Sequence, residues 1–294
     1  MIVAVIDVGS NSVRLLVADV DGSSVRERCR ERVYVRLGDD AYRFGQIGVQ
    51  KLHETRDVVA SFARIAHEAG AVRLETIVTA PGRQSVNADE LVRAIASGSG
   101  ASVVVLSAEE EGRLAWEGAV ARMPDAPDVV ATIDLGGGSC EIAVGTPILG
   151  PAWVRSFEAG ALRVTRAFLD GDDRESSAID DARVSIARLL TDETPPVPDA
   201  ALAVGGSARA VSKILGPTFG ANQLVDLARR LGASTPRAIA RRFGITEERA
   251  ETLLGGTLVL AEVSNLVGTD LELGRGGLRE GAAIALARAE AAAA

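Results

Sequence analysis

One short pattern occurs twice in this chain, and the pair of copies constrains the fold more than any other feature of the sequence. The first copy is residues 6–14 and the second is residues 133–141. The matching positions all lie 127 residues apart: Asp7 with Asp134, Gly9 with Gly136, Ser12 with Ser139, and Arg14 with Glu141. A repeat at the separation of a domain predicts two similar lobes that each contribute the same kind of turn.

The second copy has the composition of a β-hairpin with a turn suited to an anion. Apolar runs on either side predict two strands, and Gly136, Gly137, Gly138 and Ser139 lie between them. Because glycine has no Cβ, backbone N–H groups in such a turn can approach an oxyanion closely. Carboxylates at the two ends of the turn, Asp134 and Glu141, are hard oxygen ligands that suit Mg²⁺ held against phosphate. Two ordinary hairpins with glycine-rich turns are the alternative interpretation.

Composition limits the function classes. The chain has 294 residues, 47% of them hydrophobic, which is enough for two domains with separate cores. Its formal net charge of −8 argues against nucleic-acid or anionic-membrane binding, which require a basic face. It is compatible with a phosphorylated ligand, because a cleft can be locally positive. No apolar stretch reaches the ~20 residues that span a bilayer, and no signal peptide begins the chain, so we expect a cytoplasmic protein.

Alternating helical and strand patterns predict an α/β fold in two lobes. A segment with two prolines, residues 123–128, is the expected link. The predicted lobes are therefore residues 1–123 and 124–294. From residue 219 onward the pattern is mostly helical.

Two charged residues follow predicted strands of the first lobe. Arg83 comes after a strand at 74–78 and a Pro-Gly pair, so it is expected to project from a turn where an α/β sheet binds ligands. Glu111 shares a helix face with Leu114 and Ala115, where an unpaired carboxylate is costly. Such a carboxylate suits a general base. A surface arginine and a solvated glutamate are the alternatives.

A third candidate anion loop follows a strand at 201–204. Gly205, Gly206 and Ser207 lead from this strand into a helix expected from Ala208. Backbone N–H groups at a helix N-terminus bind phosphate readily. A tight connection between a strand and a helix is the alternative.

Taken together, these stretches resemble the exopolyphosphatase and guanosine pentaphosphate phosphohydrolase family, the Ppx/GppA phosphatases, in a short two-lobed form. The pieces that carry the resemblance are residues 5–12, 36–38, 79–87, 109–114, 134–141, 160–165, 205–207 and 278–281. Their order and spacing are far more specific than any single piece.

The resemblance implies two actin-like, ribonuclease H-like α/β lobes of the ASKHA superfamily, with the active site in the interlobar cleft. It implies Glu111 as catalytic base, with Asp134 and Glu141 as acidic metal and water-positioning residues. Arg83 matches a phosphate-binding arginine. The residues expected to hold phosphate in loops are Asn11, Ser12, Gly136, Gly137, Gly138, Ser139, Gly206 and Ser207.

The expected activity is Mg²⁺-dependent (or Mn²⁺-dependent) hydrolysis of terminal phosphoanhydride bonds in inorganic polyphosphate or guanosine pentaphosphate, by a homodimer. Two other functions use the same loops. A kinase or ATPase of the superfamily would hold ATP in them, and a non-catalytic sensor would bind guanosine tetraphosphate and pentaphosphate. The sequence leaves open whether Asp7 is also a metal ligand.

Overall fold

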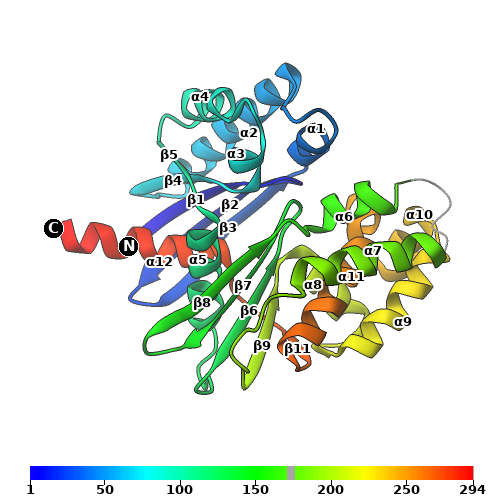
Figure 1. Cartoon of the computed structure of the whole chain (residues 1–294). Helices are drawn as coiled ribbons and strands as arrows, with labels where there is room; N and C mark the ends of the chain where they lie inside the picture. The colour runs from blue at the N-terminus through cyan, green and yellow to red at the C-terminus, as the bar shows by residue number, and fades with distance from the viewer. Residues whose placement is uncertain (171–175, 294) are drawn as a thin grey trace. The chain divides into compact units, whose positions relative to one another are not determined.

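The computed structural model describes residues 1–170 and 176–293, which form two compact units (Figure 1). Unit 1 comprises Met1–Pro124 and Gly276–Ala294, and unit 2 comprises Asp125–Arg275. The first boundary lies inside the predicted link at residues 123–128, one residue from the predicted boundary between the lobes. The prediction that all of 124–294 forms the second lobe differs from this division, because the C-terminal helix packs with unit 1.

Unit 1 is built on a five-stranded mixed sheet with the order β3-β2-β1-β4-β5. Its strands are β1 (Ile2–Val8), β2 (Val13–Asp21), β3 (Ser24–Val33), β4 (Arg73–Val78) and β5 (Ser102–Val105). β1 and β2 form an antiparallel hairpin, whereas β4 and β5 run parallel to β1. The carboxyl ends of three parallel strands therefore lie at one edge of the sheet.

Both faces of this sheet are covered by helices. Along β1, Ala4, Ile6 and Val8 face a core completed by α2 (Val49–Glu68) and α4 (Ala88–Ser99). Val3 and Val5 face the opposite core, with α5 (Ala108–Val120) and α12 (Leu278–Ala293). A strand buried on both faces reads as a continuous apolar run, and this explains the unbroken hydrophobicity of the N-terminus.

Glycines bring α5 and α12 into close contact. A Cβ on Gly118 would lie 2.1 Å from the Gly277 carbonyl oxygen, and one on Gly281 would meet the backbone of Leu114. These distances leave no room for a side chain, so the two helices approach backbone to backbone. The close approach explains why α12 belongs to unit 1 although it lies at the far end of the chain.

Unit 2 repeats this plan with one extra strand. Its order is β10-β11-β9-β6-β7-β8, where β6–β8 match β1–β3, and β9 and β11 match β4 and β5. The bounds are β6 (Val130–Leu135), β7 (Cys140–Thr146), β8 (Gly150–Phe157), β9 (Ala200–Val204), β10 (Thr218–Phe219) and β11 (Leu271–Leu273). β6 and β7 are antiparallel and β9 is parallel to β6, so the predicted internal repeat is confirmed as a repeat of topology.

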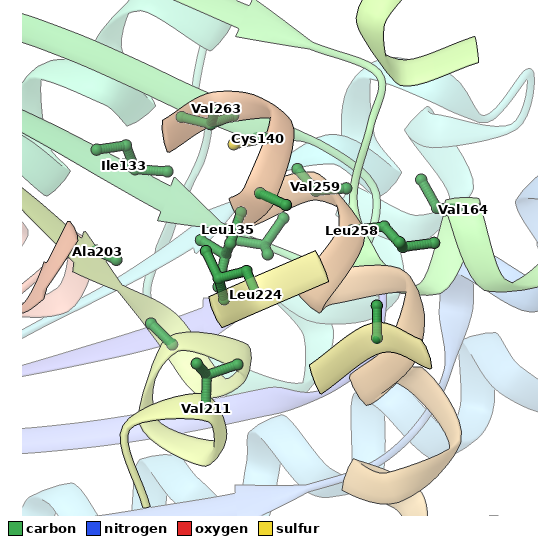
Figure 2. Close-up of a cluster of buried hydrophobic side chains, with 14 of the residues drawn as sticks. Ile133, Leu135, Cys140, Val164, Ala203, Val211, Leu224, Leu258, Val259 and Val263 are labelled. Atoms are coloured by element: carbon green, nitrogen blue, oxygen red, sulfur yellow. The ribbon is translucent and has the colours of Figure 1, made fainter. Parts of the chain in front are cut away.

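Helices supply most of the unit 2 core. They are α6 (Ala161–Phe168), α7 (Ser176–Leu190), α8 (Gly205–Leu215), α9 (Ala221–Gly232), α10 (Pro236–Phe243) and α11 (Glu247–Val267). Figure 2 shows Leu258, Val259 and Val263 of α11 among side chains from the sheet and from neighbouring helices. By length and composition α11 would qualify as a membrane span, but 83% of its apolar window is buried inside the protein. Its hydropathy is that of a core helix.

One local prediction is wrong. Residues around Arg83 form a one-turn helix, α3 (Ala80–Gln84), rather than an irregular turn, because proline is well tolerated in the first turn of a helix. The prediction that the chain is mostly helical from residue 219 is confirmed, and the structure adds β11, which pairs in parallel with β9. A three-residue strand is too short to show a period of its own in the sequence.

Candidate active-site residues in the two units

The first loop joins β1 to β2 at the edge where the parallel strands end. Asp7 and Arg14 lie directly opposite each other in the hairpin, and the amide of Gly9 donates to the Ser12 carbonyl over 3.2 Å. Asn11 and Ser12 are only 7% and 2% exposed. These two predicted phosphate-binding residues therefore lie in a fixed turn.

Helix α1 (Leu37–Phe44) holds this loop from the other side. The backbone amides of Arg36 and Gly38 donate to the carbonyls of Asn11 and Ser10, over 3.1 and 2.7 Å. Arg36 has a φ of 59°, which is unusual for a residue with a side chain. Strain of this kind persists only where the surroundings enforce it, and it often marks a functional site.

Arg83 and Glu111 form an ion pair at the ends of β4 and β5. Arg83 Nη1 donates to Glu111 Oε2 over 2.7 Å and to the Leu106 carbonyl over 3.0 Å. The Glu111 side chain is 8% exposed and that of Arg83 is 21% exposed. Burial alone would disfavour the ionised carboxylate, whereas the adjacent guanidinium favours it. The structure brings these two predicted residues together.

The start of α5 separates Glu111 from its neighbours in the acidic run. Ser107 and Glu110 form a capping box, and Glu109 pairs with Arg113 over 2.9 Å on the exposed face. Both structural roles were predicted from spacing. Of the three consecutive glutamates, only Glu111 points to the buried side.

A buried arginine near the first loop was not assigned a role from the sequence. Arg279 of α12 is 5% exposed and donates to the Leu15 carbonyl over 3.4 Å. Burial, with the nearby Arg14 charge, lowers the pKa of Arg279 to about 10, so it is still protonated at neutral pH. The signal was an Arg-Glu pair at the start of an alanine-rich helix, but the sequence does not say which unit that helix joins.

In unit 2, Asp134 and Glu141 are direct cross-strand partners of β6 and β7, as predicted for the ends of the turn. Ser156 Oγ donates to Glu141 Oε1 over 2.7 Å, which fixes the orientation of a carboxylate that is 1% exposed. Burial and the charges of Glu141 and Asp134 raise the pKa of the intervening Cys140 thiol well above its ordinary value. Cys140 is therefore a protonated, apolar part of the core.

The glycine turn between these strands has the same construction as the first loop. Gly136 donates to the Ser139 carbonyl over 3.1 Å, and the carbonyls of Gly136 and Gly137 accept from the first amides of α6. Gly160 is required there, because a Cβ on it would lie 2.3 Å from Gly137. With the carbonyls held by α6, the amides of Gly137 and Gly138 find no acceptor among the residues that the structure describes, as expected of an anion-binding turn.

The third predicted loop forms the first turn of α8, three residues earlier than expected. Gly205 has a φ of +95°, and a Cβ there would lie 2.7 Å from the Leu135 carbonyl and 3.3 Å from Asp134 Oδ1. The Asp134 carboxylate and the start of α8 are thus close neighbours. Ser207 is fully buried.

A second arginine without a role predicted from the sequence lies against this turn. Arg249 of α11 is 8% exposed, and its Nη1 is 3.5 Å from Ser207 Oγ. A Cβ on Gly206 would lie 2.2 Å from Arg249 Nη2. The guanidinium therefore occupies the space that glycine leaves open.

Only part of a metal site can be recognised from the protein side chains. Among the described residues there is no group of three or more His, Cys, Asp or Glu side chains able to hold a metal. Asp134 and Glu141 alone are still compatible with Mg²⁺, which is often bound by one or two carboxylates together with waters and substrate phosphates.

Each unit thus gathers its own set of predicted residues at the carboxyl ends of its parallel strands. Two α/β units with this repeated topology define an actin-like fold, and the fold class predicted from the sequence is confirmed. The Ppx/GppA phosphatase family model matches residues 16–290. The chain belongs to this family.

Relatives agree with this assignment. The chain is 28% identical to exopolyphosphatase 2 of Mycobacterium tuberculosis over 289 residues, covering 89% of each chain. It is 26% identical to the guanosine-5'-triphosphate,3'-diphosphate pyrophosphatase of Photobacterium profundum, covering 95% of this chain and 58% of that protein. The crystal structure of an exopolyphosphatase from Cytophaga hutchinsonii superposes with a TM-score of 0.85 at 22% identity, covering 98% of each chain.

Proposed function

We propose that this protein is an exopolyphosphatase that hydrolyses the terminal phosphoanhydride bond of inorganic polyphosphate, with guanosine pentaphosphate as a second substrate. Membership of the Ppx/GppA phosphatase family and the relatives named exopolyphosphatase and pyrophosphatase support a phosphatase. The observation that carries the catalytic assignment is the Arg83–Glu111 pair at the ends of two parallel strands. This edge is where open α/β sheets place their reactive groups.

Glu111 is the proposed general base. A base must be ionised to take a proton from water, and the 2.7 Å contact with Arg83 favours the ionised form. Arg83 neutralises a terminal phosphate oxygen while it orients Glu111. Phosphoryl transfer needs little covalent help, so positioning and charge stabilisation of this kind account for most of the acceleration.

The loops are proposed to hold the remaining phosphates. In unit 2 the proposed donors to phosphate oxygens are the amides of Gly137 and Gly138, the first turn of α8 and the Arg249 guanidinium. In unit 1 Asn11 and Ser12 form the corresponding turn. Arg279 adds a positive charge that stays buried beneath that turn.

Asp134 and Glu141 are the proposed ligands of Mg²⁺, or of Mn²⁺ in its place. Bound there, the ion would supply charge neutralisation of phosphate oxygens. Ser156 orients Glu141 by a hydrogen bond, as partners of metal-ligating carboxylates commonly do. A homodimeric assembly belongs to the same proposal and is tested by sedimentation of the purified chain.

One comparison tests the proposal against its rivals. Phosphate release is measured side by side from long polyphosphate, short polyphosphate, guanosine pentaphosphate and ATP, with Mg²⁺ and with a chelator. The expected result is Mg²⁺-dependent release from polyphosphate and the pentaphosphate. ADP formation that depends on an added acceptor would instead identify a kinase. Tight nucleotide binding without any release would identify a sensor.

A further inference from the structure

An arginine-rich hollow lies on the helical side of unit 2, in a part of the chain to which no role has been given. It has a volume of about 220 Å³ and lies between α9 and α10. Its lining includes Arg230, Arg241, Arg242, Ser234 and Phe243. Figure 1 shows both helices in yellow, next to α11.

The charge of this segment is opposite to that of the whole protein. Residues 221–245 contain five arginines and one aspartate, whereas the chain carries a net charge of −8. The three lining arginines are exposed, and no ion pair joins them to a carboxylate in the described parts of the chain. The one aspartate, Asp226, pairs with Arg229 over 3.1 Å. The positive charge of the hollow is therefore not cancelled locally.

Helix stability accounts for part of this charge. Arg230 lies in the last turn of α9, and Arg241 and Arg242 lie in the last turn of α10, where basic residues stabilise a helix. The end of α10 is also held by Lys213, which donates to the Gly244 carbonyl over 2.6 Å. Arg237 lies in the first turn of α10, where a positive charge opposes the helix dipole. The helix dipoles therefore do not explain all five arginines of the segment.

The geometry suits phosphate oxygens. The Arg242 guanidinium lies 5.4 Å from the centre of the Phe243 ring, which restrains the arginine next to the hollow. Arginine binds phosphate through paired N–H groups, and Ser234 offers a hydroxyl beside them. Among the described residues that line the hollow, the half-buried Phe243 is the one aromatic, so the hollow lacks the row of exposed rings on which successive nucleobases stack.

We propose that this arginine hollow binds a segment of a polyphosphate chain remote from the bond that is cleaved, and so tethers long substrates. The inference rests on the proposed function for its choice of ligand. A narrow, linear polyanion can reach a small basic patch on a protein whose net charge is −8, whereas a nucleic acid duplex or a membrane surface requires a broad basic face.

The test compares two double variants of the full chain. R241Q/R242Q removes two charges from the hollow. R93Q/R188Q removes the same charge from exposed helical positions on α4 and α7. Binding of long polyphosphate and of tripolyphosphate is measured at fixed salt, together with KM and kcat for each. Circular dichroism confirms that both variants are folded.

We expect R241Q/R242Q to weaken binding of long polyphosphate about tenfold, the sum of two exposed guanidinium–phosphate contacts. KM for the long chain should rise by the same factor, with kcat and the tripolyphosphate reaction unchanged, and R93Q/R188Q should behave as the parent protein. Equal losses in both double variants, or no loss in either, would overturn the tether. Equal loss for single-stranded DNA of the same length would overturn the assignment to polyphosphate.

The measurement of polyphosphate binding separates this inference from the proposed function. A parent protein that binds long polyphosphate through the hollow but releases no phosphate would refute the exopolyphosphatase and leave the tether intact. A protein that hydrolyses polyphosphate normally in the R241Q/R242Q variant, with unchanged binding, would refute the tether alone.

Discussion

Arg83 Nη1 lies 2.7 Å from Glu111 Oε2, so a residue from the helix that follows β4 and a residue from the helix that follows β5 contact each other directly. They are 28 residues apart in the chain. The proposed phosphate ligand and the proposed base are therefore one unit whose two members cannot be changed independently.

The first prediction concerns this pair. E111Q should lower kcat for polyphosphate by ~10²–10³, the usual loss when one positioned catalytic group is removed. Glutamine keeps the shape and a hydrogen bond to Arg83, so the protein should remain folded. E109Q, on the exposed face of α5, is the matched control and should leave kcat unchanged. Parent-like hydrolysis by E111Q, measured as phosphate release, would refute the base assignment.

R83Q should be strongly non-additive with E111Q. Because both act on the same step, the double variant should lose little more activity than E111Q alone. Additive losses would mean that Arg83 and Glu111 serve separate steps.

Metal dependence gives the second prediction. D134N should raise the Mg²⁺ concentration for half-maximal activity by ~10–100-fold, and removal of metal by a chelator should abolish phosphate release in the parent protein. D192N, at an exposed position in unit 2, is the control. Full activity in the presence of the chelator would show that Asp134 and Glu141 hold no catalytic metal.

The third prediction tests the first turn of α8. G206A places a Cβ 2.2 Å from Arg249 Nη2, and the flexible guanidinium must move aside. We expect a rise in KM of roughly tenfold with the fold retained, since one phosphate donor is displaced. R249A should produce the same rise, and the two changes combined should add little. An unchanged KM in both variants would exclude this turn from the substrate site.

The fourth prediction concerns α12. G118A places a Cβ 2.1 Å from the Gly277 carbonyl, where backbone rather than a side chain would have to move. We expect a loss of more than ~3 kcal/mol in the free energy of unfolding, as for severe overpacking. E109A, on the exposed face of the same helix, should lower the free energy of unfolding by only a few tenths of a kcal/mol, roughly the usual effect of a surface substitution. Denaturant unfolding of both variants decides whether α12 is held by this contact.

The fifth prediction is a pH dependence at Glu75 of β4. Burial raises the pKa of this carboxyl above its ordinary 4.5, so the folded state binds its proton more readily than the unfolded chain. When Glu75 is protonated, at pH values below 4.5, it does not destabilise the fold. As pH rises above 4.5 the buried carboxyl has to ionise, and the free energy of unfolding falls. E75Q should be more stable than the parent by roughly 0.5 kcal/mol at pH 7, with no difference in acid. Thermal unfolding at several pH values measures this; a constant difference would contradict it.

Much of the site was predictable because its residues lie in local patterns. The pairs Asp7–Arg14 and Asp134–Glu141 follow from a hairpin with a four-residue turn, and the capping box at Ser107 follows from spacing alone. Glu111 stood out because it shares a helix face with apolar residues. The position of a loop amide, or of a carboxylate at a strand end, is set by a few residues next to it in the chain. Such positions can therefore be predicted from the local sequence.

The sequence by itself determined the two repeated α/β units, the turns at their strand ends and the identity of most proposed site residues. Only the tertiary structure decided that α12 packs with the first unit, that Arg249 fills the space over Gly206, and that Arg83 is paired with Glu111. Each of these depends on contacts between segments distant in the chain. Periodicity reports which side of an element is buried, but the partner that buries it is fixed by the packing of the whole unit.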